Sequence, residues 1–526
     1  MGIPVHSIPS STRNMPQLKP RSGQYVGLPR RFLYALSLLL FASIGSLWAQ
    51  TGGGSGALFD ESRYVKIPLA APLTHASYQN NVRYSLKPYC PRPGDQLESG
   101  TCVGWAVAYG ARTIAEAVMN GWSTQSDKTR INNSAFSPSF TYNLILANEG
   151  ISDCSIGGYI VDALELLKQQ GAVPINNFPF NEDCSQLPDE NLLQQADTFR
   201  IKDYQRLTFY SKDDAKTDKV RQCIANDMPV IVGIKILDNL KNTKHEKYIW
   251  NPKSGDPSKA ITHAMVVVGY DDTEQTFELM NSWGDQWCNE GFFYIKYDDF
   301  NQYVREAYVL IFDRPITKNR SDQITLSASI DFKRLETEGI APDVICQNQS
   351  IGRMSAIQGK DEMMYKMINT YDSYTGYQAY ITTHQQNMVV YAFSYDPSGK
   401  TDLLYPFQPE VIALYGAESG NTVITPLIPI PESTIALPHE DYCMQLDEQS
   451  GTINCFLFSK QEIAIDELLN RIENGTGEFR KRLYDAIPDN RRANRQLIKY
   501  ATTGIGFEAN IADYAIVPVV IDMNHR

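Results

Sequence analysis

Cysteine, positive charge and long apolar runs are all scarce in this chain. Nine Cys among 526 residues are too few for a disulfide scaffold, and the odd number leaves at least one thiol unpaired in a monomer. Acidic residues outnumber basic residues by 60 to 48, which excludes a general nucleic-acid binder because such proteins present a basic surface. Hydrophobic residues make up 43% and charged residues 21%, values that favour folded domains over a disordered chain.

The main apolar stretch lies near the N-terminus and predicts export. Arg30 and Arg31 precede the uncharged residues 32–49, which end in small residues, as a secretory signal peptide does. The stretch is slightly short for a membrane span of about 20 residues. We therefore interpret residues 1–49 as a signal peptide, with an uncleaved membrane anchor as the alternative. Either interpretation makes the remainder secreted, periplasmic or displayed on the cell surface, beginning with an extended leader over 50–85.

A cysteine at the start of a predicted helix is the first candidate for chemistry. Residues 101–120 carry apolar side chains three and four positions apart, which predicts a helix that begins around Cys102 and ends at Gly121. The free N–H groups and dipole of a helix start lower the pKa of a thiol and favour the thiolate. A lone Cys is more often a small buried hydrophobe, so this position alone does not establish catalysis.

A histidine and an asparagine come together in a predicted hairpin. His263 begins an apolar strand over 263–270, and Asn281 ends a second strand over 276–281. In a hairpin centred on Asp272 the two side chains lie opposite one another, because each is nine residues from the centre. An amide that orients an imidazole beside a nucleophile is the arrangement that covalent catalysis requires.

These segments together resemble the papain-like cysteine peptidases. The shared elements, in order along the chain, are Gln96, Cys102, His263 with Ala264, and the run Asn281, Ser282, Trp283 and Gly284. The histidine follows the cysteine by 161 residues, somewhat more than the roughly 130–150 typical of the family. The resemblance covers residues 86–313 and implies an α+β, two-lobed fold with a helical lobe and an antiparallel β-barrel-like lobe.

The resemblance also implies a role for each matched residue. Cys102 is expected to be the nucleophile and His263 the base and acid, with Asn281 holding the imidazole. Trp283 is expected to shield that hydrogen bond and to belong to the substrate-binding residues. The side-chain amide of Gln96 is expected to stabilise the oxyanion together with the backbone N–H of Cys102.

The segment after Cys154 resembles the part of the family that binds the substrate backbone as an added strand. Gly157 and Gly158 are the expected contacts, because a missing side chain lets a peptide approach. The same resemblance implies a disulfide between Cys154 and Cys184. The chain departs from the family pattern at a few positions, among them Ser99, Val103, Thr262 and Cys288.

Residues 314–526 are predicted to form a β-rich accessory domain. Strand-like runs at 377–384 and 388–396 support this prediction. Residues 389–393, the turn 396–399 and residues 403–406 are similar to a domain of uncharacterised function found behind bacterial papain-like peptidases. Cys443 and Cys455 each lie six residues from Gln449, so a hairpin turn there would bring them together as a disulfide.

We therefore predict an exported cysteine endopeptidase that acts on protein or peptide substrates, needs no cofactor or metal, and meets a membrane only through an uncleaved N-terminal segment. The alternative is a catalytically silent papain-like protein that binds peptides or mediates surface adhesion, and acyl transfer in place of hydrolysis stays open. The long helical propeptide of the family is not evident in the sequence. Residues 57–85 or the C-terminal region are hypothesised to cover the active site of a latent form.

Overall fold

The computed structural model describes most of the chain after its N-terminal region. The described residues are 56–74, 82–210, 216–243, 248–313, 324–337, 346–407, 422–439, 442–447 and 451–526. The predicted signal peptide lies outside them. Within these ranges, no helix combines the length and the apolar character that a membrane crossing would need.

The first half of the chain contains a helical lobe built around one long helix. The segments α3 (Cys102–Gly104), η3 (Trp105–Arg112) and α4 (Thr113–Asn120) follow one another without a break, and the middle segment is π-helical. Gly121 ends the helix in the left-handed conformation, with φ of 64°, as the sequence predicted. The π-helical segment is buried along its whole length, so this helix forms the centre of the lobe.

Shorter helices complete this lobe. They are α5 (Lys128–Asn133), α6 (Pro138–Asn148), α7 (Ile160–Gln169) and α8 (Glu190–Asp197). Helix α6 begins where its sequence favours it, because the Ser137 hydroxyl accepts the N–H of Phe140 and Pro138 occupies the first helical position. The expected disulfide between Cys154 and Cys184 is present.

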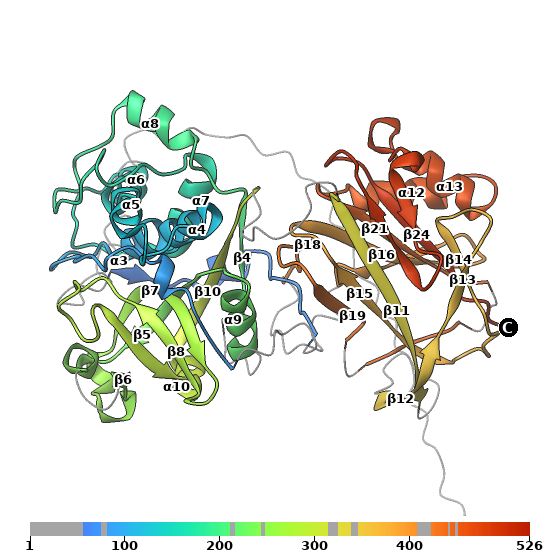
Figure 1. Ribbon diagram of the computed structural model, residues 1–526, viewed down its shortest axis with the longest axis horizontal. Coiled ribbons are helices and arrows are strands. Elements are labelled where there is room, and N and C mark those ends of the chain that lie inside the picture. Colours follow the sequence, from blue (N-terminus) through green and yellow to red (C-terminus); the bar gives the residue numbers. More distant parts are fainter. Residues whose placement is uncertain are drawn as a thin grey trace, which may run out of the picture. The chain divides into compact units, whose positions relative to one another are not determined.

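An antiparallel sheet forms the second lobe (Figure 1). Its strands, in spatial order, are β4 (Asp203–Arg206), β10 (Val304–Ile311), β5 (Val230–Ile236), β7 (Ile261–Asp271), β8 (Thr276–Met280), β9 (Phe292–Lys296) and β6 (Ile249–Trp250), with β2 (Arg83–Ser85) also paired to β7 and β6 parallel to β9. Helices α9 (Lys216–Ala225) and α10 (Tyr297–Tyr303) accompany the sheet. Strands β7 and β8 confirm the two strands predicted over 263–270 and 276–281.

The second half of the chain is β-rich, as predicted, and contains two sheets. One sheet has the order β19 (Ser433–Leu437), β15 (Gly376–Thr383), β11 (Leu326–Thr337), β23 (Ile505–Ala509) and β22 (Ile498–Tyr500), with β12 (Cys346–Met354) and β20 (Met444–Gln445) attached. The other has the order β13 (Ala356–Gln358), β14 (Met364–Met367), β24 (Val517–Asp522), β21 (Ile453–Ser459), β16 (Met388–Tyr395) and β17 (Thr401–Tyr405), with β18 (Leu427–Ile428) attached.

These elements form three layers. The two sheets share one apolar core, in which Phe332 of β11 meets Phe456 of β21. Alternate residues of β16 and β21 point to the opposite face, where they pack against α12 (Ile465–Glu473) and α13 (Phe479–Ala486) (Figure 1). One face of the first sheet therefore packs into the core, and α12 and α13 do not cover its other face.

The leader predicted as extended chain is folded against both halves. Residues Ala57–Leu58 form β1, Asp60 caps the short helix α2 (Glu61–Tyr64), and Tyr64 is buried. Farther along, the N–H of Leu69 donates to the carbonyl of Val423 at 2.8 Å, and the Leu69 side chain joins the core between the two C-terminal sheets.

The predicted disulfide between Cys443 and Cys455 is wrong. Cys443 is disulfide-bonded, but Cys455 is a free and fully buried thiol. The chain on either side of residue 449 does not pair with itself: β20 pairs with β15, whereas β21 pairs with β16 and β24. The two cysteines are therefore assigned to different sheets, and a turn between them in sequence does not bring them together.

The close approach of Gly171 to the backbone of Ala196 can be tested by substitution. Its φ is +89°, and an added Cβ would overlap the carbonyl oxygen of Ala196. Gly150 has a φ of +70° with nothing within 4 Å of an added Cβ, so Gly150→Ala costs only the left-handed backbone, about 1–2 kcal/mol. We expect Gly171→Ala to lower the thermal unfolding midpoint several degrees more than Gly150→Ala. Equal shifts would contradict the packing described for this turn.

Candidate active site

The three principal candidates lie where the two lobes meet. Cys102 is the first residue of α3, and α3 packs against β7, which carries His263 (Figure 1). Asn281 follows the last residue of β8. His263 and Asn281 are 1% and 3% exposed.

The imidazole and the amide meet as predicted, although by a different register. His263 Nε2 lies 2.8 Å from Asn281 Oδ1. The strands pair with Val266 opposite Met280 and Asp271 opposite Thr276, with a bulge between Val267 and Gly269. The turn between the strands is therefore longer than the predicted turn centred on Asp272. His263 and Asn281 are diagonal neighbours, and their hydrogen bond lies outside the paired residues of β7 and β8.

An aromatic layer covers this hydrogen bond. The Trp283 ring stacks on the imidazole of His263, with a centroid distance of 5.3 Å and an interplanar angle of 24°. Trp287 in turn packs edge-on against Trp283 at 5.0 Å. The Trp283 ring thus lies over one face of the imidazole, and its role in shielding the hydrogen bond stays a prediction.

Gln96 is fixed from both sides. Its Nε2 donates to the carbonyl of Ser99 at 2.7 Å, and its Oε1 accepts the Ser282 hydroxyl at 2.6 Å. The backbone N–H of Gln96 also donates to the carbonyl of Ser282 at 2.8 Å. Ser99 occupies the position of a cysteine in the resembled family, and here its carbonyl orients the amide.

Ser282 is a positioning residue that the sequence analysis did not single out. Besides its bond to Gln96, its N–H donates to Asn281 Oδ1 at 2.8 Å. One serine therefore links the amide expected at the oxyanion to the amide that holds the imidazole. Its place inside the Asn-Ser-Trp-Gly run was the signal that could have identified it.

The sulfur of Cys102 is covered by the leader. Cys102 is 0% exposed, and a Cβ added to Gly56 would lie 2.5 Å from its sulfur. Burial raises the pKa of the thiol to about 12, although the backbone N–H groups of Ala264 and Gly56 are among those that favour the thiolate. The sequence predicted a lowered pKa from the helix start, and in this covered state burial outweighs that effect.

Burial also keeps the imidazole neutral. It lowers the pKa of His263 to about 4, while the hydrogen bond to Asn281 acts in the opposite direction. With a raised thiol pKa and a lowered imidazole pKa, proton transfer from Cys102 to His263 is unfavourable while the leader is in place. The structure is thus that of a covered and uncharged site.

The leader occupies the edge expected to receive substrate. Strand β1 pairs in parallel with β3 (Gly158–Tyr159), and the N–H of Gly158 donates to the carbonyl of Gly56 at 3.0 Å. The hydroxyl of Thr262, next to His263, donates to the carbonyl of Ala57. The predicted contact Gly158 is used by the leader, and Gly157 adjoins it in the chain.

A side chain of the leader, that of Phe59, packs beside this edge. A Cβ added to Gly233 of β5 would lie 2.8 Å from the Phe59 ring and 3.3 Å from both Ile160 and Glu306. Glu306 is buried and accepts the Tyr308 hydroxyl at 2.9 Å. Burial raises the pKa of Glu306 to about 7, against the hydrogen bond from Tyr308.

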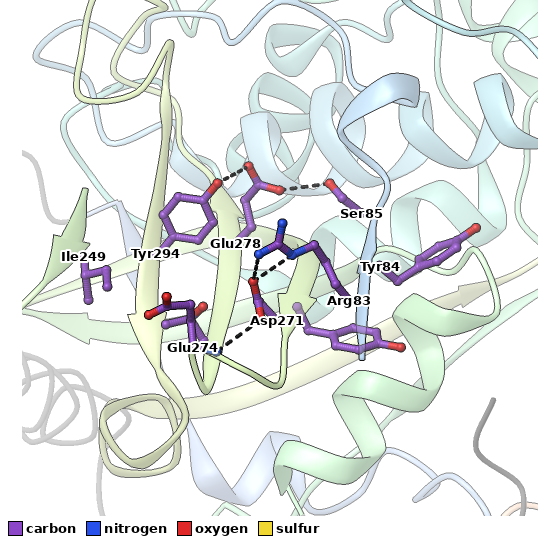
Figure 2. A pocket seen from close by; sticks show the side chains of 10 residues that line it. Arg83, Tyr84, Ser85, Ile249, Asp271, Glu274, Glu278 and Tyr294 are labelled. Carbon is purple, nitrogen blue, oxygen red and sulfur yellow. Dashed lines mark hydrogen bonds and ion pairs between the residues drawn. The ribbon is translucent and has the colours of Figure 1, made fainter. Parts of the chain in front are cut away.

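A separate pocket lies at the other end of the β7–β8 hairpin. It encloses about 360 Å³, and none of the predicted site residues lines it. Figure 2 shows Arg83 paired with Asp271, and Tyr294 and Ser85 both donating to Glu278. These polar groups satisfy one another, so this pocket is not the centre of the predicted chemistry.

Comparison with known proteins agrees with the motif and the geometry. Residues 121–311 match the sequence profile described as papain family cysteine protease; the match begins 19 residues after Cys102. A cysteine protease of Blomia tropicalis is 25% identical over 255 residues, which are 47% of this chain and 69% of that protein. An uncharacterised peptidase C1-like protein of Acanthamoeba polyphaga mimivirus is 23% identical over 39% of this chain and 63% of its own length.

Solved structures include xylellain, a cysteine protease from Xylella fastidiosa. It is 20% identical and aligns with a TM-score of 0.42, covering 51% of this chain and 99% of xylellain.

The covered sulfur leads to a test of reactivity. A protein that begins at Asp60 lacks Gly56, so we expect its Cys102 to react with iodoacetamide at pH 7 at least tenfold faster than in the chain with the leader. In the chain with the leader, the rate should rise about tenfold per pH unit from 7 to 10, because the thiolate fraction does so below the thiol pKa. Mass spectrometry of the Cys102 peptide measures both rates. The half-buried thiol of Cys288 is the internal control, and equal Cys102 rates with and without the leader would refute the covering.

Proposed function

We propose that the chain is a cysteine-type peptidase of the papain family, an exported endopeptidase that hydrolyses peptide bonds through Cys102, His263, Asn281 and Gln96. The hydrogen bond between His263 and Asn281 is the observation that carries this proposal, because it orients the imidazole beside the helix start that bears the nucleophile. Protein or peptide substrates follow from the family.

The proposed reaction begins once substrate replaces the leader. The sulfur of Cys102 attacks the scissile carbonyl carbon, and the thiol proton passes to His263. The negative charge on the carbonyl oxygen is stabilised by the backbone N–H of Cys102 and by the side-chain amide of Gln96. Collapse of the tetrahedral intermediate expels the amine, which takes the proton from His263. Water activated by His263 then hydrolyses the acyl-enzyme and restores the thiol.

The polar contacts around Gln96 and Asn281 support these roles. Ser282 fixes both amides, so the donor at the oxyanion and the orienting group of the imidazole keep a set spacing. A catalytically silent binding protein would not require this linked set. Displacement of the leader is needed in either case, since Gly56 lies against the sulfur.

We propose that the leader maintains a latent form. It pairs with Gly158, receives the hydroxyl of Thr262, and places Phe59 beside Gly233 and Ile160. A substrate that uses the same strand edge competes with these contacts. The space that Phe59 occupies is expected to take an aromatic or aliphatic substrate side chain when the leader leaves.

Substitution of Gln96 tests the proposed oxyanion stabilisation. In the protein that begins at Asp60, Gln96→Ala should lower kcat/KM for a fluorogenic peptide by about 10²–10³, mainly through kcat, because one charge-stabilising donor is lost. Gln222→Ala removes a buried amide from α9 and should change kcat/KM by no more than about twofold. Cys102→Ala should abolish turnover, and peptidase activity that survives this change would disprove the proposed nucleophile.

Export is tested on the full chain in a secreting bacterial host. We expect a mature protein outside the cytoplasm whose intact mass lacks approximately residues 1–49, because the apolar stretch directs translocation and is then removed. Leu39→Arg interrupts that stretch and should leave the uncleaved protein in the cytoplasm. An exported protein of full mass would support the membrane anchor, whereas export unaffected by Leu39→Arg would exclude both interpretations.

A further inference from the structure

The outer face of one C-terminal sheet brings a serine, a histidine and a glutamate together. Side chains of β11 alternate, so Ala328 and Ile330 join the core between the sheets, whereas Ser329 points to the opposite face and is partly exposed. His384 follows β15, which pairs with β11, and Glu432 precedes β19, which pairs with the other edge of β15. The three residues are far apart in sequence and meet only through the pairing of three strands.

Their geometry is that of a nucleophile, a base and an orienting carboxylate. The hydroxyl of Ser329 lies 3.1 Å from His384 Nε2, and His384 Nδ1 lies 2.6 Å from Glu432 Oε2. A carboxylate only accepts hydrogen bonds, so in the neutral imidazole the proton is on Nδ1 and Nε2 accepts the serine hydroxyl. This is the tautomer in which an imidazole can remove the serine proton.

The carboxylate is placed by a turn. Glu432 has a φ of +53° and lies in the turn directly before β19, where a left-handed residue is common. The side chains of Glu432 and His384 are both partly exposed, so the pair is in contact with solvent.

A groove passes over the three side chains. It encloses about 790 Å³, and Ser329, His384 and Glu432 all line it together with Lys499 and Arg353. That volume lies in the range that binds small organic ligands. The hydroxyl is therefore reachable by a ligand, in contrast to the covered sulfur of Cys102.

We propose that Ser329, His384 and Glu432 form a second nucleophilic site, which transfers the acyl group of a small ester to water. Ser329 Oγ attacks the ester carbonyl carbon while its proton moves to His384 Nε2. The tetrahedral intermediate collapses, the bond to the alcohol oxygen breaks, and the departing alkoxide takes the proton from His384. Water then gives a proton to His384 and its oxygen to the acyl carbon, which releases a carboxylic acid and restores Ser329 with its proton.

In this reaction Glu432 is a positioning residue. It holds the proton on Nδ1 and stabilises the imidazolium that forms when the serine proton is removed. The groove is open to solvent, and the leaving group receives a single proton, which comes from His384. An ester is therefore the expected substrate class, because an alkoxide leaves more readily than the amine of a peptide bond.

The test uses the full chain with Cys102→Ala, so that the thiol contributes nothing and failure of the proposed peptidase does not affect the outcome. A fluorophosphonate probe should form a bond from phosphorus to Ser329 Oγ with loss of fluoride, located by peptide mass spectrometry. Labelling should vanish in Ser329→Ala and slow at least tenfold in His384→Gln. Glu432→Gln should slow it less, since it leaves the base in place.

Ser327 provides the matched control. It lies two residues before Ser329 on the same face and lines the same groove, and its carbonyl accepts the N–H of His384 at 2.9 Å. Ser327→Ala should label at the rate of the parent protein. The parent should also release p-nitrophenol from p-nitrophenyl acetate beyond one equivalent, and Ser329→Ala should not.

Three results would overturn the proposal. Absence of labelling at Ser329 in a folded parent protein would show that the three residues are only a polar cluster on a solvent-facing sheet. Equally fast labelling of the parent protein and of His384→Gln would show the same. Unchanged thermal unfolding of each variant, measured alongside, ensures that lost labelling does not reflect lost structure. Ester turnover that persists in Ser329→Ala would likewise exclude this serine as the nucleophile.

Discussion

The burial of the Cys102 sulfur determines the state of the candidate active site, and the contact with the backbone of Gly56 is part of that burial. Burial raises the thiol pKa from its ordinary value of 9 to about 12, which makes ionisation harder by about 4 kcal/mol. Burial also lowers the pKa of His263 to about 4. Both shifts favour the uncharged forms, so exposure to water would favour ionisation of both groups.

Only glycine permits this contact at position 56. A Cβ there would also overlap the carbonyl oxygen of Gly100, at the turn that precedes α3. The leader is then held by backbone pairing with Gly158 and by the Phe59 side chain. The sulfur of Cys102 is thus covered by a short extended strand, whereas the papain-like family has a long helical propeptide.

The leader also reaches the C-terminal sheets. Leu69 is bonded to Val423 and contributes its side chain to the core between those sheets. Gly56, which covers Cys102, and Leu69, which packs into the second core, are 13 residues apart in the chain. In the described part of the C-terminal region, α12 and α13 pack on one sheet, and the outer face of the other sheet carries polar residues.

Much of the active site could be predicted because its signals are local. Cys102 at a helix start, the helix end at Gly121, and strands beginning near His263 and ending near Asn281 are all fixed by neighbouring residues, through spacing and turn chemistry. The disulfide between Cys154 and Cys184 and the positions of Gln96 and Trp283 followed from the resemblance. Even the wrong hairpin register left His263 and Asn281 close, because diagonal neighbours in a sheet remain within reach.

The remaining features depend on contacts between residues distant in sequence. The sequence by itself determined which side chains could react and roughly where their helix and strands lie, because those preferences act over a few residues. Tertiary structure alone decided that Gly56 covers Cys102, that Cys443 and Cys455 belong to different sheets, and that Ser329 meets His384. Burial and strand order are properties of the packed chain, and no local pattern specifies which distant segment supplies the neighbour.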